Sequence, residues 1–174
     1  MYMKGLQRIF ILSFFILGSV KVNAQASATA DIFATIVSPI TIEKVAGKDL
    51  NFGNIAAGKF AGIVVLKTNG NRGISGGAVL PSTSGTASAA EFVVSGESSY
   101  SFSITLPTAP VTMVNTSTSE TMVVDGFTSS PESTGTLSAG KQTVKIGARL
   151  NINANQSPGD YSSASPFVVT VNYN

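Results

Sequence analysis

The sequence predicts an all-β fold, an immunoglobulin-like antiparallel β-sandwich, and two observations support this. Apolar and polar residues alternate along many short runs, which is the period of a strand with one buried face. Turn-forming pairs such as Asn69-Gly70, Asp125-Gly126 and Pro158-Gly159 separate these runs. No stretch shows convincing helical periodicity. Many short strands divided by turns are typical of a sandwich or a barrel.

Residues 1–26 have the features of a secretory signal peptide. Lys4 and Arg8 form a positive n-region, and an apolar run of about ten residues follows from Ile9. Small residues allow a cut after Ala24 or after Ala26. The run is shorter than the roughly 20 residues of a spanning helix, so we expect no membrane span in the mature form. We expect a secreted protein of the periplasm, the outer surface or the extracellular space.

Residues 27–38 form an alternating N-terminal strand. Its apolar positions are Ala28, Ala30, Ile32, Ala34 and Ile36. Nine residues at about 3.3 Å each give roughly 30 Å of strand, long enough to cross a sandwich. Ser38-Pro39 then separates this segment from the run that begins at Ile40, because proline cannot serve a central ladder. The segment is either a donor extension that pairs with a neighbour or half of a split first strand that changes sheets at Pro39.

Residues 39–174 form the β-sandwich domain. The clearest strands are Tyr100 to Leu106, Gln142 to Asn153 and Phe167 to Tyr173, and in the last of these Phe167, Val169, Val171 and Tyr173 share one face. Shorter candidate strands are Asp49 to Phe52, Gly62 to Lys67, Ala78 to Leu80, Glu91 to Ser95 and Thr121 to Asp125. The glycine-rich stretch from Gly70 to Gly77 predicts a flexible hairpin, since no helix follows that could bind a phosphate.

Two details of the domain concern aromatic residues. Most of them fall on the inward parity of strands, and Phe33, Phe60 and Phe127 are the candidates for outward platforms that a sugar or partner could contact. Tyr161 follows Pro158-Gly159, an arrangement similar to the corner turns of immunoglobulin-like sandwiches, where a tyrosine ties a loop back to the sheet.

Composition excludes several classes of function. The chain has no Cys and no His, which removes disulfides, cysteine nucleophiles, Ser-His-Asp triads and zinc sites of the usual ligand types. Removing residues 1–26 takes away Lys4, Arg8 and Lys21 but no acid, so the 11 basic residues fall to eight against nine acids. The eight are scattered, and we expect no nucleic-acid partner. We also expect no cofactor and no metal.

The remaining candidates for chemistry are weak. Ser138 and Lys141 have the S-x-x-K spacing of penicillin-recognising enzymes, but Ala139-Gly140 between them predicts a hairpin turn instead of the required helix. A carboxylate pair for glycoside hydrolysis could come from Glu91, Glu97, Asp125, Glu132 and Asp160, yet the sequence brings no two of them together. We therefore expect a protein that is not an enzyme.

Several motifs together resemble a known family. They are Ile40 to Ile42, Leu50 to Ile55, Ala90 to Gly96, Tyr100 to Phe102, Ile146 to Leu150, Gly159 to Tyr161 and Val169 to Asn174. This order is similar to the secreted bacterial family called domain of unknown function 4402, and in turn to spore coat protein U and to fimbrial subunits of the chaperone-usher kind. The resemblance implies an incomplete sandwich whose missing strand is donated by the next subunit. It also implies a periplasmic chaperone, an outer-membrane usher and a role for Tyr173 as the penultimate tyrosine.

These observations lead to two expectations about function. The first is an exported structural or adhesive cell-surface protein, a fimbria-like subunit that associates with itself or with other surface proteins by strand donation. The alternative is a monomeric surface module that binds a glycan or a protein.

Overall fold

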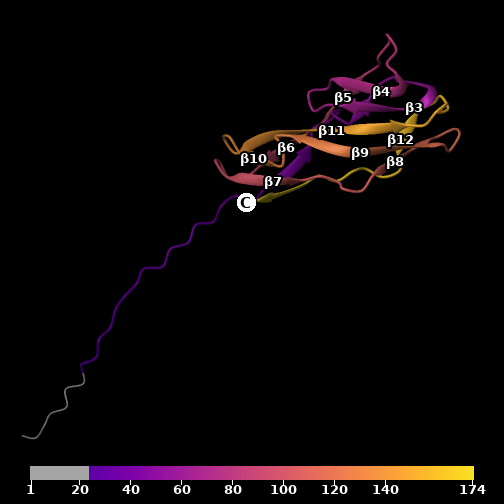
Figure 1. Ribbon diagram of the computed structural model, residues 1–174. Helices are drawn as coiled ribbons and strands as arrows, with labels where there is room; N and C mark the ends of the chain where they lie inside the picture. The colour runs from indigo at the N-terminus through magenta and orange to yellow at the C-terminus, as the bar shows by residue number, and fades with distance from the viewer. Residues whose placement is uncertain (1–23) are drawn as a thin grey trace, which may run out of the picture. The chain divides into compact units, whose positions relative to one another are not determined.

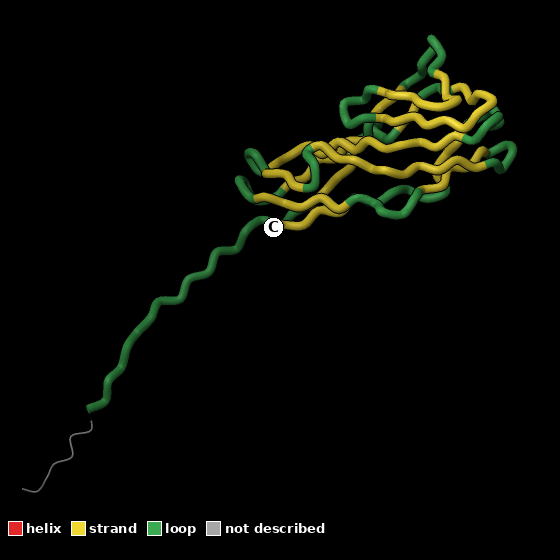
Figure 2. Tube along the Cα trace, viewed as in Figure 1, coloured by secondary structure: helices red, strands yellow, loops and turns green. Residues whose placement is uncertain are grey.

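The chain folds as an antiparallel β-sandwich, which confirms the predicted fold class. The structure is a computed structural model that describes residues 24–174, so all but the last residues of the predicted signal peptide lie outside the described part. Strands and loops make up this part, with no helix between residues 24 and 174 (Figure 2). The chain divides into two compact units, Met1–Thr35 and Ile36–Asn174.

All the strands of the described residues lie in the second unit. In chain order they are β1 (Thr41–Lys44), β2 (Asn51–Phe52), β3 (Ala56–Leu66), β4 (Arg72–Val79), β5 (Ala87–Ser88), β6 (Ala90–Ser95), β7 (Ser101–Thr105), β8 (Val111–Asn115), β9 (Thr121–Ser130), β10 (Thr134–Thr136), β11 (Lys141–Ile152), β12 (Tyr161–Ser163) and β13 (Thr170–Tyr173). Within the described residues no helix is long and apolar enough to cross a membrane.

The strands form one large sheet and two small ones. The large sheet has the order β1-β6-β11-β9-β8-β12, with β3 beside β11 and β4 beside β3. The second sheet has the order β10-β7-β13, and β2 pairs with β5. Every one of these pairings is antiparallel.

Strand β11 is the centre of the large sheet (Figure 1). One of its edges pairs with β6 over Lys141 to Ile146 and then with β3 over Ala148 to Ile152, while β9 pairs with the opposite edge. The predicted alternation holds along its whole length, since its buried residues are Val144, Ile146, Gly147, Ala148, Leu150 and Ile152. All but Gly147 belong to the inward face, and one strand thus contributes to two cores.

The first core lies between the large sheet and the β10-β7-β13 sheet. Its buried members are Ala90, Val94, Phe102, Ile104, Leu137, Val144, Ile146, Val169 and Val171. The second core lies against the other half of the large sheet, and Phe52 of β2 packs into it. Its buried members are Phe52, Val64, Leu66, Ala78, Val124, Ala148, Leu150 and Ile152.

The stretch from Gly70 to Gly77 belongs to a hairpin, as predicted, because β3 and β4 pair around a turn at Gly70; it corrects only the expected flexibility, since most of it is strand β4. The β3–β4 ladder shifts register between Ala57 and Gly62, and the bulged backbone passes very close to β4. A Cβ at Gly77 would overlap the Phe60 carbonyl oxygen, and one at Gly62 would overlap the Ala78 amide nitrogen. The glycines of this stretch therefore permit close approach of two strands, which is a different use from flexibility.

Phe127 corrects a second prediction, because it points inward and not outward. Its ring lies 5.2 Å from that of Phe167 and packs against both cores. The cause is an irregularity in the β9–β11 ladder at Gly126, whose φ is +55°, so the alternation after Asp125 is offset by one residue. Phe60 is exposed, as predicted, and its side chain retains 76% of its accessible surface.

Candidate functional site

The unpaired edge of β13 is the feature that best fits an interaction site. Asn174 donates its backbone N–H to the carbonyl oxygen of Ser101 in β7 at 3.2 Å. Bonded and non-bonded residues alternate in an antiparallel ladder, so the backbone groups of Val171 and Tyr173 face the other edge. Among the described residues β7 is the only strand that pairs with β13. This edge therefore presents free donors and acceptors.

Strand β1 lies beside β13, and within residues 24–174 it pairs on one edge only, with β6. Val45 donates its N–H to the Glu91 carbonyl at 2.9 Å, so the backbone groups of Ile42 face away from β6. The two strands run in opposite directions. Tyr173 lies near the beginning of β1, whereas the Phe167 ring is 6.3 Å from Phe92, which pairs with Lys44 at the end of β1. Two unpaired antiparallel edges thus flank one side of the first core.

The apolar face predicted for the last strand lies directly beneath this edge. Val169 and Val171 are buried members of the first core, and Phe167 and Tyr173 pack against it. Each of the two valines keeps 8% of its surface accessible, more than the fully buried Val94 and Val144 in the centre of the same core. The structure therefore brings all four predicted residues together at the margin of the core, but β13 begins only at Thr170, so Phe167 and Val169 precede the strand.

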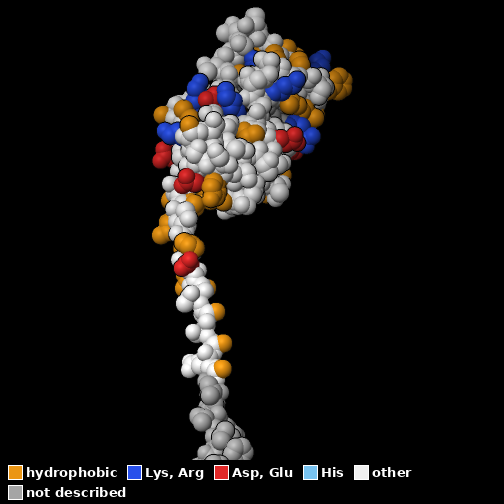
Figure 3. Space-filling view, turned by 90° about the vertical axis from the view of Figure 1, so that its left-hand side faces the viewer, with side chains coloured by type: hydrophobic (Ala, Val, Ile, Leu, Met, Phe, Trp, Pro, Cys, Tyr) orange, Lys and Arg blue, Asp and Glu red, His pale blue; other side chains and the backbone are white. Residues whose placement is uncertain are grey.

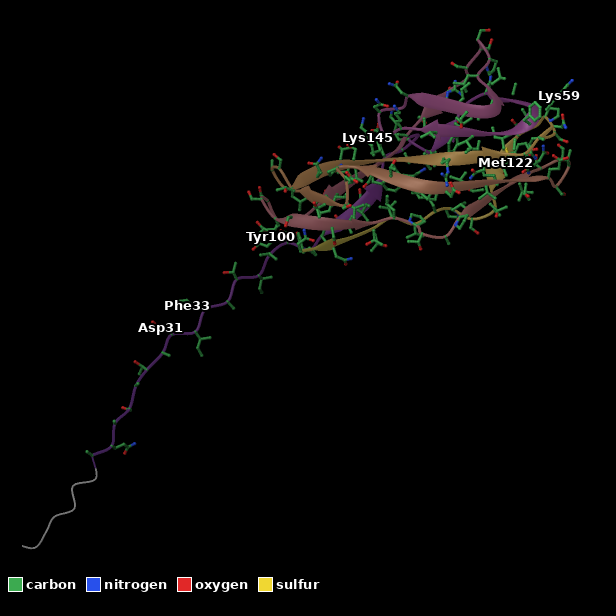
Figure 4. The ribbon with its side chains drawn as sticks, in the orientation of Figure 1. Asp31, Phe33, Lys59, Tyr100, Met122 and Lys145 are labelled. Carbon is green, nitrogen blue, oxygen red and sulfur yellow. The ribbon has the colours of Figure 1, made fainter. Side chains whose placement is uncertain are left out.

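The alternating N-terminal segment is described separately, because it belongs largely to the first unit. No strand is assigned between residues 24 and 40, and Ala28, Ala30, Ile32, Ala34 and Ile36 are all exposed. Figure 4 labels Asp31 and Phe33 on this segment, and the Phe33 side chain is 88% exposed. Its apolar positions have no sheet in the described residues, and their role as a donor strand stays a prediction.

Three hydrogen bonds connect Ser38, Glu97 and Tyr173 within the second unit. Ser38 donates its N–H to Glu97 Oε2 at 3.0 Å, and the Tyr173 hydroxyl donates to the Ser38 carbonyl at 2.8 Å. Glu97 donates its N–H to the Tyr173 hydroxyl oxygen at 2.6 Å. Sequence reasoning named Tyr173 as the penultimate tyrosine, Glu97 as a candidate carboxylate and Ser38 as part of a break between strands, but it linked none of the three. No local pattern could have linked Ser38 to partners that are 59 and 135 residues away.

Glu91 and Asp125, two of the candidate carboxylates, form ion pairs with basic side chains. Glu91 pairs with Lys145 at 3.3 Å, and Arg149 Nε donates to Asp125 at 2.6 Å. This hydrogen bond from Arg149 lowers the pKa of Asp125 below its usual value. Ser138 and Lys141 exchange two backbone hydrogen bonds at 3.1 Å across a turn, as the hairpin interpretation predicted. The described residues contain no cluster of three acids that could hold a metal ion.

Charged side chains of both signs are interspersed over the face of the domain seen in Figure 3. They do not gather into a basic or an acidic surface on that face. One groove of about 620 Å³ has a floor that includes Ile104, Leu106 and Phe127, and Lys67 and Glu132 also line it. This mixture of apolar and polar groups could contact a small polar ligand, but Glu132 is the single carboxylate in its lining. A carboxylate pair is thus absent from this groove.

The loop before β12 is fastened by the predicted tyrosine and by an acid that sequence reasoning missed. The Tyr161 hydroxyl donates to the Ser157 carbonyl at 2.8 Å, as expected of a corner tyrosine. Glu120 accepts from the Ser157 hydroxyl at 2.7 Å, from the Ser157 N–H at 3.0 Å and from Gln156 at 2.9 Å. These hydrogen bonds, led by the Ser157 hydroxyl, lower the pKa of Glu120.

Comparison with known proteins gives one positive finding. A family model described as "Domain of unknown function (DUF4402)" matches residues 40–173, which is nearly all of the second unit. No curated protein and no solved structure matches the chain. The matched family agrees with the resemblance noted from the motifs, and its description carries no activity.

Proposed function

The chain belongs to the family of the domain of unknown function 4402, and we propose that it is an exported, non-enzymatic structural or adhesive protein of the cell surface. In this proposal it is a fimbria-like subunit that assembles by strand donation. The observation that carries the proposal is the unpaired edge of β13 beside the unpaired edge of β1, at the margin of the first core. An exposed strand edge is a template for pairing with another chain.

The alternating segment of residues 28–36 supports the same proposal from the other side of the contact. Its five apolar positions recur with the period of a strand, and all five are exposed. A segment of this kind, added to β13, gains backbone hydrogen bonds and covers the partly accessible Val169 and Val171. One subunit thus offers both an acceptor edge and a donor segment, and repeated head-to-tail donation gives an open filament. A periplasmic chaperone and an outer-membrane usher belong to the proposal as assembly partners.

Deletion of residues 29–37 tests the proposal. The full-length mature protein should form filaments that negative-stain microscopy detects, and the deleted protein should remain monomeric. An equally stable deleted monomer, together with full-length protein that never polymerises, would rule out strand donation.

A matched pair of substitutions sharpens this test. Ile32→Asp places a charge on the apolar face of the donor and should reduce polymer at least about tenfold, because a carboxylate would enter an apolar environment. Phe33→Asp carries the same charge on the opposite face and should polymerise like the parent. Light scattering after size-exclusion chromatography measures both. Equal loss in the two variants would show that the alternation has no role.

A second candidate function is a monomeric binding module, and the groove of about 620 Å³ is the observation that favours it. Lys67 and Glu132 would then contact a glycan over the apolar floor around Phe127. Binding of the mature protein and of its Glu132→Ala variant to a glycan array tests this candidate. Binding that depends on Glu132, by a protein that stays monomeric, would favour the module over the subunit.

A further inference from the structure

Ser38 is the residue from which the alternating segment departs, and both of its backbone polar groups are occupied. Its N–H donates to Glu97 and its carbonyl accepts from the Tyr173 hydroxyl. Pro39 follows immediately and has no N–H to donate. The chain direction at this point is therefore set by three hydrogen bonds that involve neither β1 nor any other strand pairing.

The Tyr173 hydroxyl is held in place from several sides. The Tyr173 ring packs edge-on against Tyr100, with centroids 5.6 Å apart, and Figure 4 labels Tyr100 just before β7. A Cβ at Gly96 would overlap the Tyr173 hydroxyl oxygen, so a residue without a side chain provides the space that the hydroxyl fills. The Glu97 N–H then fixes its orientation at 2.6 Å. The hydroxyl is thus positioned before it contacts Ser38.

This arrangement affects whether the segment can pair with β13 of its own subunit or with β13 of a second copy. Ser38 lies at the Tyr173 end of β13, and β1 runs from that end in the direction opposite to β13. To pair with its own β13, the segment would have to reverse between Ile36 and Ile40 and run parallel to that strand. A tight reversal centred on Ser38 changes the backbone dihedral angles of this residue. That change rotates its N–H and carbonyl away from Glu97 and Tyr173, so reversal requires the loss of both hydrogen bonds.

We infer that Tyr173 and Glu97 are positioning residues that disfavour pairing of the segment with its own β13 and so direct it to the β13 edge of a second copy. The inference rests on the proposed strand donation and adds a specificity to it. Tyr173 has two roles in this inference, since its backbone belongs to the acceptor edge and its hydroxyl orients the segment that is donated. The contribution of the hydroxyl can be measured separately, because Tyr173→Phe keeps the strand and the ring.

Engineered disulfides can show whether the segment pairs with its own β13 or with that of a second copy, because the natural chain contains no cysteine. Asn172→Cys places a thiol on the exposed face of β13, and Thr35→Cys or Phe33→Cys places one on the matching face of the segment. Oxidation of the full mature chain then gives disulfide-linked ladders when the segment pairs with a neighbour. It gives compact monomers without free thiols when the segment pairs with its own strand. Non-reducing electrophoresis and thiol counting separate the two products.

With Tyr173 intact we expect ladders to dominate. Tyr173→Phe should raise the ratio of intrachain to interchain disulfide about fivefold or more, since it removes two hydrogen bonds at Ser38 and Glu97. Tyr100→Phe is the matched control: it removes a hydroxyl from the same ring pair, and that hydroxyl makes no hydrogen bond in the described residues, so the ratio should not change. Glu97→Ala should move the ratio in the same direction as Tyr173→Phe. Glu97→Gln, which can still accept from the Ser38 N–H, should restore the parental ratio.

Two results would overturn the inference, and they are distinguishable. Ladders of equal yield in the parent, Tyr173→Phe and Glu97→Ala would remove the positioning role and leave strand donation standing. Absence of both kinds of disulfide in every background would overturn strand donation, and the positioning role with it. Thermal unfolding of each variant identifies any that fails to fold, and Glu97→Ala, which leaves the Tyr173 ring in place, then provides the decisive comparison.

Discussion

The two halves of the domain share strand β11, but their edge strands differ in how regularly they pair. Around the first core, β13 pairs residue by residue with β7 and leaves a regular edge beside β1. Around the second core, the β3–β4 ladder is interrupted by a bulge, and the outer strand β12 has only three residues. Bulges and short outer strands are devices that discourage the addition of another strand. Strand length does not separate the halves, since β13 has only four residues, but the bulge beside the edge strand β4 discourages pairing in the second half, whereas the ladder of β13 with β7 is regular.

The second half is also fastened by side chains to loops. Arg72 donates from Nη1 to the carbonyls of Phe52 and Asn54 at 2.7 and 3.0 Å, which ties β4 to the strand that covers the second core. Glu120 binds the loop before β12 through Ser157 and Gln156. In the first half the corresponding side-chain contacts hold Ser38, where the alternating segment departs. In the proposed function, the second half stabilises the fold and the first half takes part in strand donation.

The largest expected effects test whether the two halves are separate. Phe102→Ala in the first core and Leu66→Ala in the second remove side chains with no accessible surface, and each should lower the free energy of unfolding by about 3–5 kcal/mol. Because β11 contributes to both cores, urea unfolding followed by circular dichroism should show a single transition in both variants. A second transition in either variant would mean that the halves unfold independently.

A smaller effect tests the close approach that distinguishes the second half. Gly77→Ala should destabilise the protein by about 1–3 kcal/mol, because its Cβ would overlap the backbone at Phe60. Gly73→Ala lies in the same strand, has no atom within 4 Å of the added Cβ, and should change stability by less than about 0.5 kcal/mol. Urea midpoints measure both variants. Equal effects would show that the bulge has room to relax.

The smallest effect concerns the pH dependence of the Glu120 contact. Hydrogen bonds from Ser157 place the pKa of this carboxyl below its ordinary value of 4.5 in the folded state. The folded state therefore favours the ionised form, and the resulting stability is present above pH 4.5 and is lost as the pH falls through the lowered pKa. Glu120→Gln cannot titrate, so its stability should decline less than that of the parent between pH 5 and about pH 3. Thermal unfolding at a series of pH values provides the measurement, and parallel declines would contradict the assignment.

Regular alternation made much of the fold predictable. Val144, Ile146 and Leu150 are inward as predicted, and so are Phe102 and Ile104, because a strand with one buried face has a period of two. Prediction was wrong where that period is interrupted, at Gly126 before Phe127 and in the glycines of β4. In both places a residue without a side chain allows a local backbone geometry that depends on a distant strand.

The candidate site was predictable only in part. The face formed by Phe167, Val169, Val171 and Tyr173 followed from alternation, and the structure places it at the margin of the first core. The unpaired edge depends on which strands become neighbours, which alternation does not encode. The contacts of Ser38 with Glu97 and Tyr173 depend on the same tertiary arrangement, so no pattern near Ser38 predicts them.

The length of β11 has a mechanical consequence. Its 12 residues span about 40 Å in a single stretch, and its side chains belong to both cores. A load applied at one end of the strand is transmitted along covalent bonds to the other, with no linker between the halves that could extend first. The domain should therefore resist tension up to one threshold and then unfold as a whole.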